Sequence, residues 1–121
     1  MKLTIGIPNF NGGDNLKEVI ESCQHIQLPR KEIEILIVDN QSTDDSISTI
    51  EKLKGKFSNI KLWQNSENVG RIGNWNEVLE KAGGDYLILL FTNDRIYEKM
   101  ILKNFLKSLM KILVYQYVFH H

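Results

Sequence analysis

The sequence predicts one α/β domain built around a mainly parallel sheet. Four short apolar segments alternate with three amphipathic helical patterns of about 10 to 15 residues, as right-handed crossovers between parallel strands require. Of the 121 residues, 42% are hydrophobic and 25% are charged, which is typical of an ordinary globular domain and argues against a disordered, collagen-like or transmembrane chain. We therefore expect a three-layer, Rossmann-like sandwich with helices on both faces of the sheet.

The first elements in the chain are a strand, a helix and a second strand. Residues 3–7 alternate between aliphatic and small side chains and stop at a proline, which predicts a strand that ends in a loop. Asp14 or Asn15 is expected to cap the helix that follows. Residues 33–38 are a nearly continuous aliphatic run that ends at Asp39, as in a strand covered on both faces. The apolar face of the helix comprises Leu16, Val19, Ile20, Cys23 and Ile26.

The next elements repeat this alternation. Thr43 or Asp44 is expected to cap a second helix that ends at Gly55, and residues 60–62 mark a short third strand. A third helix stops at a glycine pair, and residues 86–91 form a fourth, wholly apolar strand. The apolar face of the third helix comprises Ile72, Trp75, Val78, Leu79 and Ala82.

The end of the chain carries a different pattern. Residues 96–113 have the periodicity of a long amphipathic helix, and residues 114–119 have the composition of a strand. We therefore divide the domain into a ligand-binding half, residues 1–95, and a terminal part, residues 96–121. Lysines recur every four residues in the helix, so it is expected either to pack with a solvated lysine face or to contact an anionic membrane surface or a second copy of the chain.

Charge and cysteine content limit the partners and the compartment. The formal net charge is zero, and no Lys/Arg cluster precedes the terminal helix, which disfavours nucleic-acid binding. The lone Cys23 excludes an intrachain disulfide, lies in an apolar helical pattern and is expected in the core. The amino-terminal apolar run is too short for a signal peptide. We expect a cytoplasmic protein, either free or peripheral at the inner face of the membrane.

Polar residues follow three of the four strands. In an open parallel sheet, ligands bind in the crevice at the carboxyl ends of the strands. The third helix opens with glycines and Arg71, a combination that favours phosphate. The polar residues after the strands are Asn9, Asn11, Asp39, Asn40, Ser42, Thr43, Asp44, Thr92, Asn93 and Asp94.

Three familiar ligand sites are excluded by the residues at this edge. The loop after the first strand lacks G-x-G-x-x-G, which disfavours NAD, and the chain contains no G-x-x-x-x-G-K-[ST] phosphate loop. A phospho-receiver domain would need an acidic pair after the first strand, where Asn9 and Asn11 stand instead.

Four segments in order resemble the motifs of the family 2 glycosyltransferases. Residues 8–12 read PNFNG, residues 37–44 read IVDNQSTD, residues 65–70 read NSENVG, and residues 84–94 read GDYLILLFTND. The resemblance covers about residues 3–95, the amino-terminal part of such a domain. It implies a GT-A fold and the transfer of a sugar from a nucleotide-diphosphate sugar, with UDP favoured, to an acceptor hydroxyl in glycan or cell-surface polysaccharide synthesis.

The resemblance also assigns residues to the nucleotide. It implies that Asp39 accepts a hydrogen bond from the base, whereas an alternative is that Asp39 is the turn partner of Ser42 and Thr43. Asp44 is better explained as a helix cap. The residues that the resemblance places at the nucleotide are Pro8, Asn9, Asn11, Asp39, Asn68, Gly70 and Arg71.

The family's metal-binding motif is altered in this chain. The resemblance implies that Asp94, with a weak contribution from Asn93, binds Mg²⁺ or Mn²⁺ at the diphosphate. Phe91 stands where the first aspartate of the motif is often found.

The sequence contains no identifiable general base. In inverting family members, a carboxylate in the second half of the catalytic domain takes the proton of the acceptor hydroxyl, and we expect this truncated chain to lack it. An alternative to an enzyme is therefore a non-catalytic nucleotide-binding or interaction module.

Overall fold

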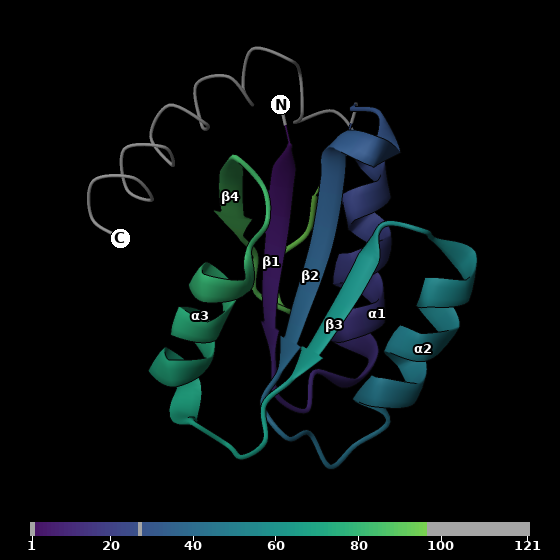
Figure 1. Cartoon of the computed structure of the whole chain (residues 1–121). Helices are drawn as coiled ribbons and strands as arrows, with labels where there is room; N and C mark the ends of the chain where they lie inside the picture. The colour runs from purple at the N-terminus through teal and green to yellow at the C-terminus, as the bar shows by residue number, and fades with distance from the viewer. Residues whose placement is uncertain (1, 27, 97–121) are drawn as a thin grey trace.

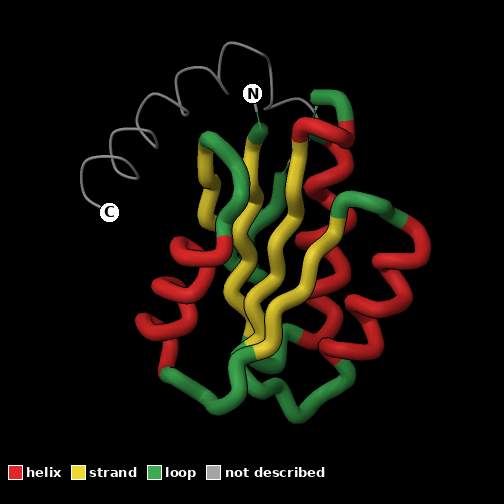
Figure 2. Tube along the Cα trace, in the orientation of Figure 1, coloured by secondary structure: helices red, strands yellow, loops and turns green. Residues whose placement is uncertain are grey.

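The structure is a computed structural model that describes residues 2–26 and 28–96. These residues form the expected three-layer α/β sandwich around one parallel sheet with the strand order β3-β2-β1-β4 (Figures 1 and 2). The strands are β1 (Leu3–Asn9), β2 (Ile33–Asp39), β3 (Ile60–Gln64) and β4 (Tyr86–Leu89). The helices are α1 (Gly13–Ser22), α2 (Ser46–Lys56) and α3 (Gly70–Lys81), with short 3-10 turns at Cys23–His25 and Arg30–Glu32.

The helices divide between the two faces of the sheet. Figure 1 shows α1 and α2 on one side of the strands and α3 on the other. Alternate residues of β1 and β2 pack with α1 and α2 in the larger core, as the period of two in a strand requires. Leu36 and Val38 face the other way and pack with Val78 of α3. A methyl group at Gly6 would overlap the Val78 side chain, so the glycine allows α3 to approach the sheet.

Cys23 occupies the core position that its pattern predicts. Its side chain is buried, and it belongs to the cluster beneath α1. Burial raises the pKa of the Cys23 thiol to about 12, because the thiolate would lose its hydration there. The thiol is therefore a packing group at neutral pH.

Several element boundaries differ from the predicted ones. β1 continues through Pro8 and Asn9, which were expected in a loop, and β4 ends at Leu89 instead of residue 91. Pro8 has no N–H to donate to a neighbouring strand. It faces the β4 side of β1, where the last inter-strand hydrogen bond runs from Leu90 N to Gly6 O, so the strand tolerates the proline. α2 also continues past Gly55 to Lys56.

The predicted cap of α1 is wrong. The helix begins at Gly13, before Asp14 and Asn15, and the residue at its N-cap position makes no side-chain capping bond. Gly13 N donates instead to Asp44 Oδ2, at 3.0 Å, from the loop after β2. The other carboxylate oxygen of Asp44 accepts a 3.0 Å bond from Ser46 N, the first residue of α2. One carboxylate therefore satisfies N–H groups at the starts of two helices.

The terminal helix and strand predicted for residues 96–113 and 114–119 lie outside the described residues, apart from Ile96. Within residues 2–26 and 28–96, no helix is both long enough and apolar enough to cross a membrane.

Replacing Asp44 by alanine is predicted to destabilise the fold by about 1 to 2 kcal/mol near neutral pH, because two helix starts lose a cap. Partial burial opposes ionisation, but the hydrogen bonds from Ser46 and Gly13 outweigh it and lower the Asp44 pKa from its usual value of 3.8. This stabilisation is therefore complete above that value and is lost as the pH falls through the folded-state pKa. Urea unfolding at several pH values measures it.

The matched control is Asp45→Ala, since Asp45 occupies the N-cap position of α2 without a side-chain capping bond. Equal losses of stability in the two variants, or a loss at Asp44 that does not change with pH, would contradict the double-cap assignment.

Candidate functional site

A pocket of about 560 Å³ lies at the carboxyl ends of β1, β2 and β4, beside the start of α3. This is the edge at which an open parallel sheet binds ligands. We call it the carboxyl-end pocket. It is lined by Pro8, Asn9, Phe10, Asn40, Asn68, Arg71, Asn74, Trp75, Phe91, Thr92 and Asn93.

Asn40 links the loop after β2 to the start of α3. Its Nδ2 donates to Asn68 Oδ1 at 3.0 Å and to Gly70 O at 3.2 Å. Its Oδ1 accepts from Asn65 Nδ2 at 3.1 Å and from Val69 N at 2.9 Å. Asn40 is 3% exposed, so all four of these bonds replace lost hydration.

The network continues into the interior and fixes the first turn of α3. Asn65 Nδ2 also donates to Asn74 Oδ1 at 2.8 Å, and Asn74 Nδ2 donates to Val38 O of β2. Gly70 has a φ of +80°, in the left-handed region that favours glycine, and its N–H donates to Asn68 Oδ1. These contacts set where the side chains of the first turns of α3 stand against the sheet.

The wall of the pocket combines one cation with aromatic rings. The guanidinium carbon of Arg71 lies 5.6 Å from the centroid of the Trp75 ring. The Trp75 ring is 5.2 Å from that of Phe91, at an interplanar angle of 50°. Among the described residues, Arg71 is the one ionisable side chain in the lining, so this wall suits an anionic ligand with a planar part.

Asp39 and Asn9 form a buried pair beneath this wall. Asn9 Nδ2 donates to Asp39 Oδ1 at 2.8 Å, and Ser42 donates to the same carboxylate through its hydroxyl at 2.6 Å and its N–H at 3.0 Å. Asp39 is 2% exposed. Its contacts with Ser42 are those of the turn partner that the sequence left as an alternative to base recognition.

The turn after β4 carries the predicted metal-binding residues. Phe91 N donates to Asp94 Oδ2 at 2.9 Å, and Asp94 N donates to Phe91 O at 2.9 Å. Asn93 and Asp94 are exposed, and Asn93 lines the pocket. Within the described part of the chain, no group of three or more His, Cys, Asp or Glu side chains could hold a metal ion.

The structure thus brings some of the predicted site residues together and leaves others aside. Pro8, Asn9, Asn68, Arg71 and Asn93 line the pocket. Asn11, Asp39, Gly70 and Asp94 lie next to lining residues but are not part of the lining. Asn11 accepts bonds from the N–H groups of Thr43 and Asp44, so its side chain joins the loops after β1 and β2.

Sequence reasoning missed the aromatic wall. Trp75 was assigned to the apolar face of its helix with Ile72, but Ile72 is 58% exposed and Trp75 lines the pocket. Periodicity alone does not reveal this, because α3 covers the sheet mainly through Val78. A usable signal was the occurrence of Phe10, Trp75 and Phe91 within or beside the polar motifs.

Comparison with known proteins identifies relatives of the chain. The glycosyl transferase family 2 matches residues 4–117. A poly(ribitol-phosphate) beta-glucosyltransferase of Bacillus spizizenii is 31% identical over 111 residues, which are 89% of this chain. The chain spans only 18% of the length of that relative.

Solved structures of glycosyltransferases share the fold. Residues 1–349 of S. aureus TarS, crystallised with UDP-GlcNAc, superpose with a TM-score of 0.75 at 27% identity, over 90% of this chain and 30% of TarS. GalNAc-T7 with UDP, GalNAc and Mn²⁺ has a TM-score of 0.66 at 25% identity, over 75% of this chain and 17% of that one. The α/β sandwich is accordingly that of the GT-A glycosyltransferases. With this fold and a family match over residues 4–117, the chain belongs to glycosyl transferase family 2.

Proposed function

We propose that the carboxyl-end pocket binds the nucleoside diphosphate of a sugar donor, with UDP as the nucleotide. The observation that carries the proposal is the pocket wall, where Arg71 stands over Trp75 and no carboxylate belongs to the lining among the described residues. The UDP-GlcNAc complex of TarS and the beta-glucosyltransferase name of the B. spizizenii relative support it. We further propose that the donor sugar is transferred to an acceptor hydroxyl of a glycan or cell-surface polysaccharide.

The chemistry of the lining suits the parts of such a donor. A guanidinium can form two parallel hydrogen bonds with phosphate oxygens, so Arg71 is assigned to the diphosphate. The aromatic rings offer apolar faces to the base or the sugar. Pro8 and Asn9 at the end of β1 and Asn68 before α3 line the pocket on the side proposed for the base and ribose. Asn9 Oδ1 has no hydrogen-bond partner among the described residues and can accept a bond there.

Recognition of the base by Asp39 stays part of the proposal. In the conformation described, its carboxylate is buried and hydrogen-bonded to Asn9 and Ser42. Asp39 would therefore act on a base through the pocket-lining Asn9, whose amide it orients.

The turn at Asn93 and Asp94 fits a divalent cation that takes most of its ligands from the diphosphate. Both residues supply hard oxygen atoms, both are exposed, and Mg²⁺ is usually held by only one or two carboxylates besides phosphates and water. When bound, such a cation offsets the negative charge that develops on the departing diphosphate. Asp94 and Asn93 would hold it.

The described lining residues supply donor binding but no proton acceptor. No carboxylate and no histidine of residues 2–26 and 28–96 lines the pocket. Sugar transfer would thus depend on a general base outside the described lining. If the chain binds UDP but does not cleave UDP from a UDP-sugar, the alternative of a non-catalytic nucleotide-binding module applies. The sequence alone supports the proposed cytoplasmic location. It is also the sole support for membrane contact or self-association through residues 96–113.

Substituting Arg71 by glutamine is predicted to weaken UDP binding about tenfold or more, because a charge-assisted hydrogen bond contributes about 1.5 to 3 kcal/mol. Calorimetry with UDP and with uridine measures this effect, and uridine affinity should change little. Arg30→Gln is the matched control, since Arg30 stacks over Phe57 and lies outside the pocket lining. Absence of UDP binding to the unmodified chain would refute the proposed function, and unchanged affinity in Arg71→Gln would refute the role of Arg71.

Asp94→Asn is predicted to reduce the factor by which Mn²⁺ strengthens UDP binding, since the amide keeps an oxygen for the Phe91 N–H but loses the charge. Titrations with and without Mn²⁺ give this factor. The same factor in Asp94→Asn and in the unmodified chain would remove Asp94 from the cation site.

A further inference from the structure

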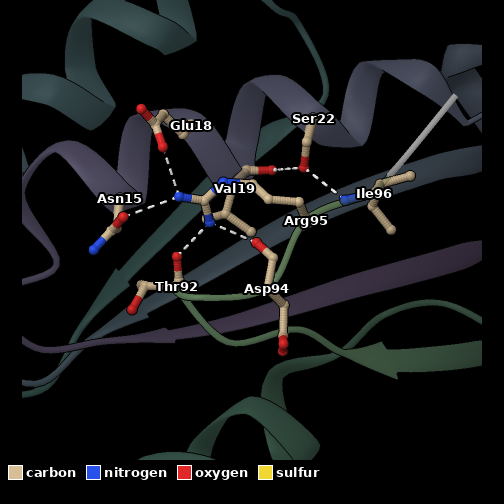
Figure 3. A network of polar contacts seen from close by, with 8 residues as sticks. All are labelled: Asn15, Glu18, Val19, Ser22, Thr92, Asp94, Arg95 and Ile96. Carbon is tan, nitrogen blue, oxygen red and sulfur yellow. Dashed lines mark hydrogen bonds and ion pairs between the residues drawn. The ribbon is translucent and has the colours of Figure 1, made fainter.

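A second arginine lies beside the turn after β4, outside the pocket lining. Figure 3 shows the guanidinium of Arg95 between this turn and α1. Nη1 donates to Thr92 O and to Asp94 O, each at 2.6 Å. Nη2 donates to Glu18 Oε2 at 2.7 Å and to Asn15 Oδ1 at 3.0 Å. The Arg95 side chain is 20% exposed and that of Glu18 is 63% exposed, so water screens the ion pair from the Glu18 side.

These bonds fix the backbone on both sides of Asn93. Thr92 O belongs to the peptide unit before Asn93, and Asp94 O belongs to the peptide unit after Asp94. Both oxygens bind the same nitrogen, so these two peptide units, one at each end of the Asn93–Asp94 pair, cannot rotate independently. Nη2 ties this turn to α1, whose residues are 77 to 80 positions away in the sequence. A further bond, from Ile96 N to Ser22 Oγ at 3.1 Å, holds the following residue on the same helix (Figure 3).

Arg95 and Asp94 are neighbours in sequence, but their charged groups bind different partners. Among the described residues, Arg95 forms its ion pair with Glu18 of α1. It touches Asp94 through the carbonyl oxygen, while the Asp94 carboxylate accepts the Phe91 N–H. Glu18 thus pairs with the arginine, and within residues 2–26 and 28–96 the Asp94 carboxylate forms no ion pair.

We propose that Arg95 is a positioning residue for the diphosphate end of the donor site. It holds the backbone of the turn that carries Asn93 and Asp94, the residues that would hold a divalent cation, and Glu18 pairs with its guanidinium. The proposal rests on the proposed nucleotide-binding function. It adds α1 to the elements that determine cation-dependent binding, although neither Glu18 nor Asn15 lines the pocket.

The test measures UDP affinity of the whole chain by calorimetry, with and without Mn²⁺, in Arg95→Gln, Arg95→Lys and Glu18→Gln. Residues that orient metal ligands typically contribute about 10-fold to 100-fold in metal affinity. The factor by which Mn²⁺ strengthens UDP binding should therefore be about 10-fold smaller in each variant than in the unmodified chain. Lysine should not rescue, because a single ammonium cannot reproduce the planar fork that bonds four acceptors. Arg30→Gln is the control and should behave as the unmodified chain.

A double substitution separates positioning from general loss of structure. In an Asp94→Asn background, Arg95→Gln should cause little further loss of the Mn²⁺ effect, since both changes act on one cation site. Glu18→Gln leaves the two carbonyl bonds of the turn in place, so it tests the proposal even if the Arg95 variants unfold.

The outcomes are distinguishable. If the unmodified chain does not bind UDP, the proposed function fails and this inference fails with it. If it binds UDP with a Mn²⁺ effect that Arg95→Gln and Glu18→Gln both retain, only this inference is overturned. Equal weakening with and without Mn²⁺ would also overturn it, because Arg95 would then support the fold alone.

Discussion

The carboxyl-end pocket depends on the hydrogen bonds of one buried amide, that of Asn40. Its two donated and two accepted bonds join the end of β2 to residues 65–70, the connection that leads into α3. An aspartate there could not donate to Asn68 Oδ1 or Gly70 O, and an alanine would remove all four bonds that hold this connection against β2. A typical hydrogen bond contributes about 0.5 to 1.5 kcal/mol to stability. The position of Arg71 and Trp75 therefore follows from Asn40.

Separate contacts hold the helices and the turn after β4 around the same edge of the sheet. Asp44 joins the starts of α1 and α2, and Gly6 lets α3 approach β1 closely enough for Val78 to pack. Arg95 ties the turn after β4 to α1. Each of these contacts connects segments that are distant in sequence, so a pocket that is polar on one side and aromatic on the other can be preformed on a small sheet. Preorganisation of this kind reduces the entropy lost when a ligand binds.

The sequence predicted the architecture better than the site. Alternating apolar segments are sufficient for a parallel sheet with helices on both faces, and motif order located the ligand edge, because both are local properties of the chain. The exposure of Ile72 and the pocket position of Trp75 depend on how α3 is rotated against the sheet, which periodicity does not specify. The bond from Gly13 to Asp44 and the two bonds from Arg95 to α1 join distant segments, and no local pattern encodes them.

Hydrogen exchange at the Val69 amide tests most directly whether Asn40 holds the site together before a ligand binds. Val69 N donates to Asn40 Oδ1 across the loop, whereas Asn65 N donates to the backbone oxygen of Asp39 and serves as an internal reference. In the ligand-free chain, the account predicts a Val69 amide protected at least about tenfold relative to an unstructured peptide, with the protection lost in Asn40→Ala while that of Asn65 largely remains. Unprotected exchange at Val69 in the unmodified chain would contradict it.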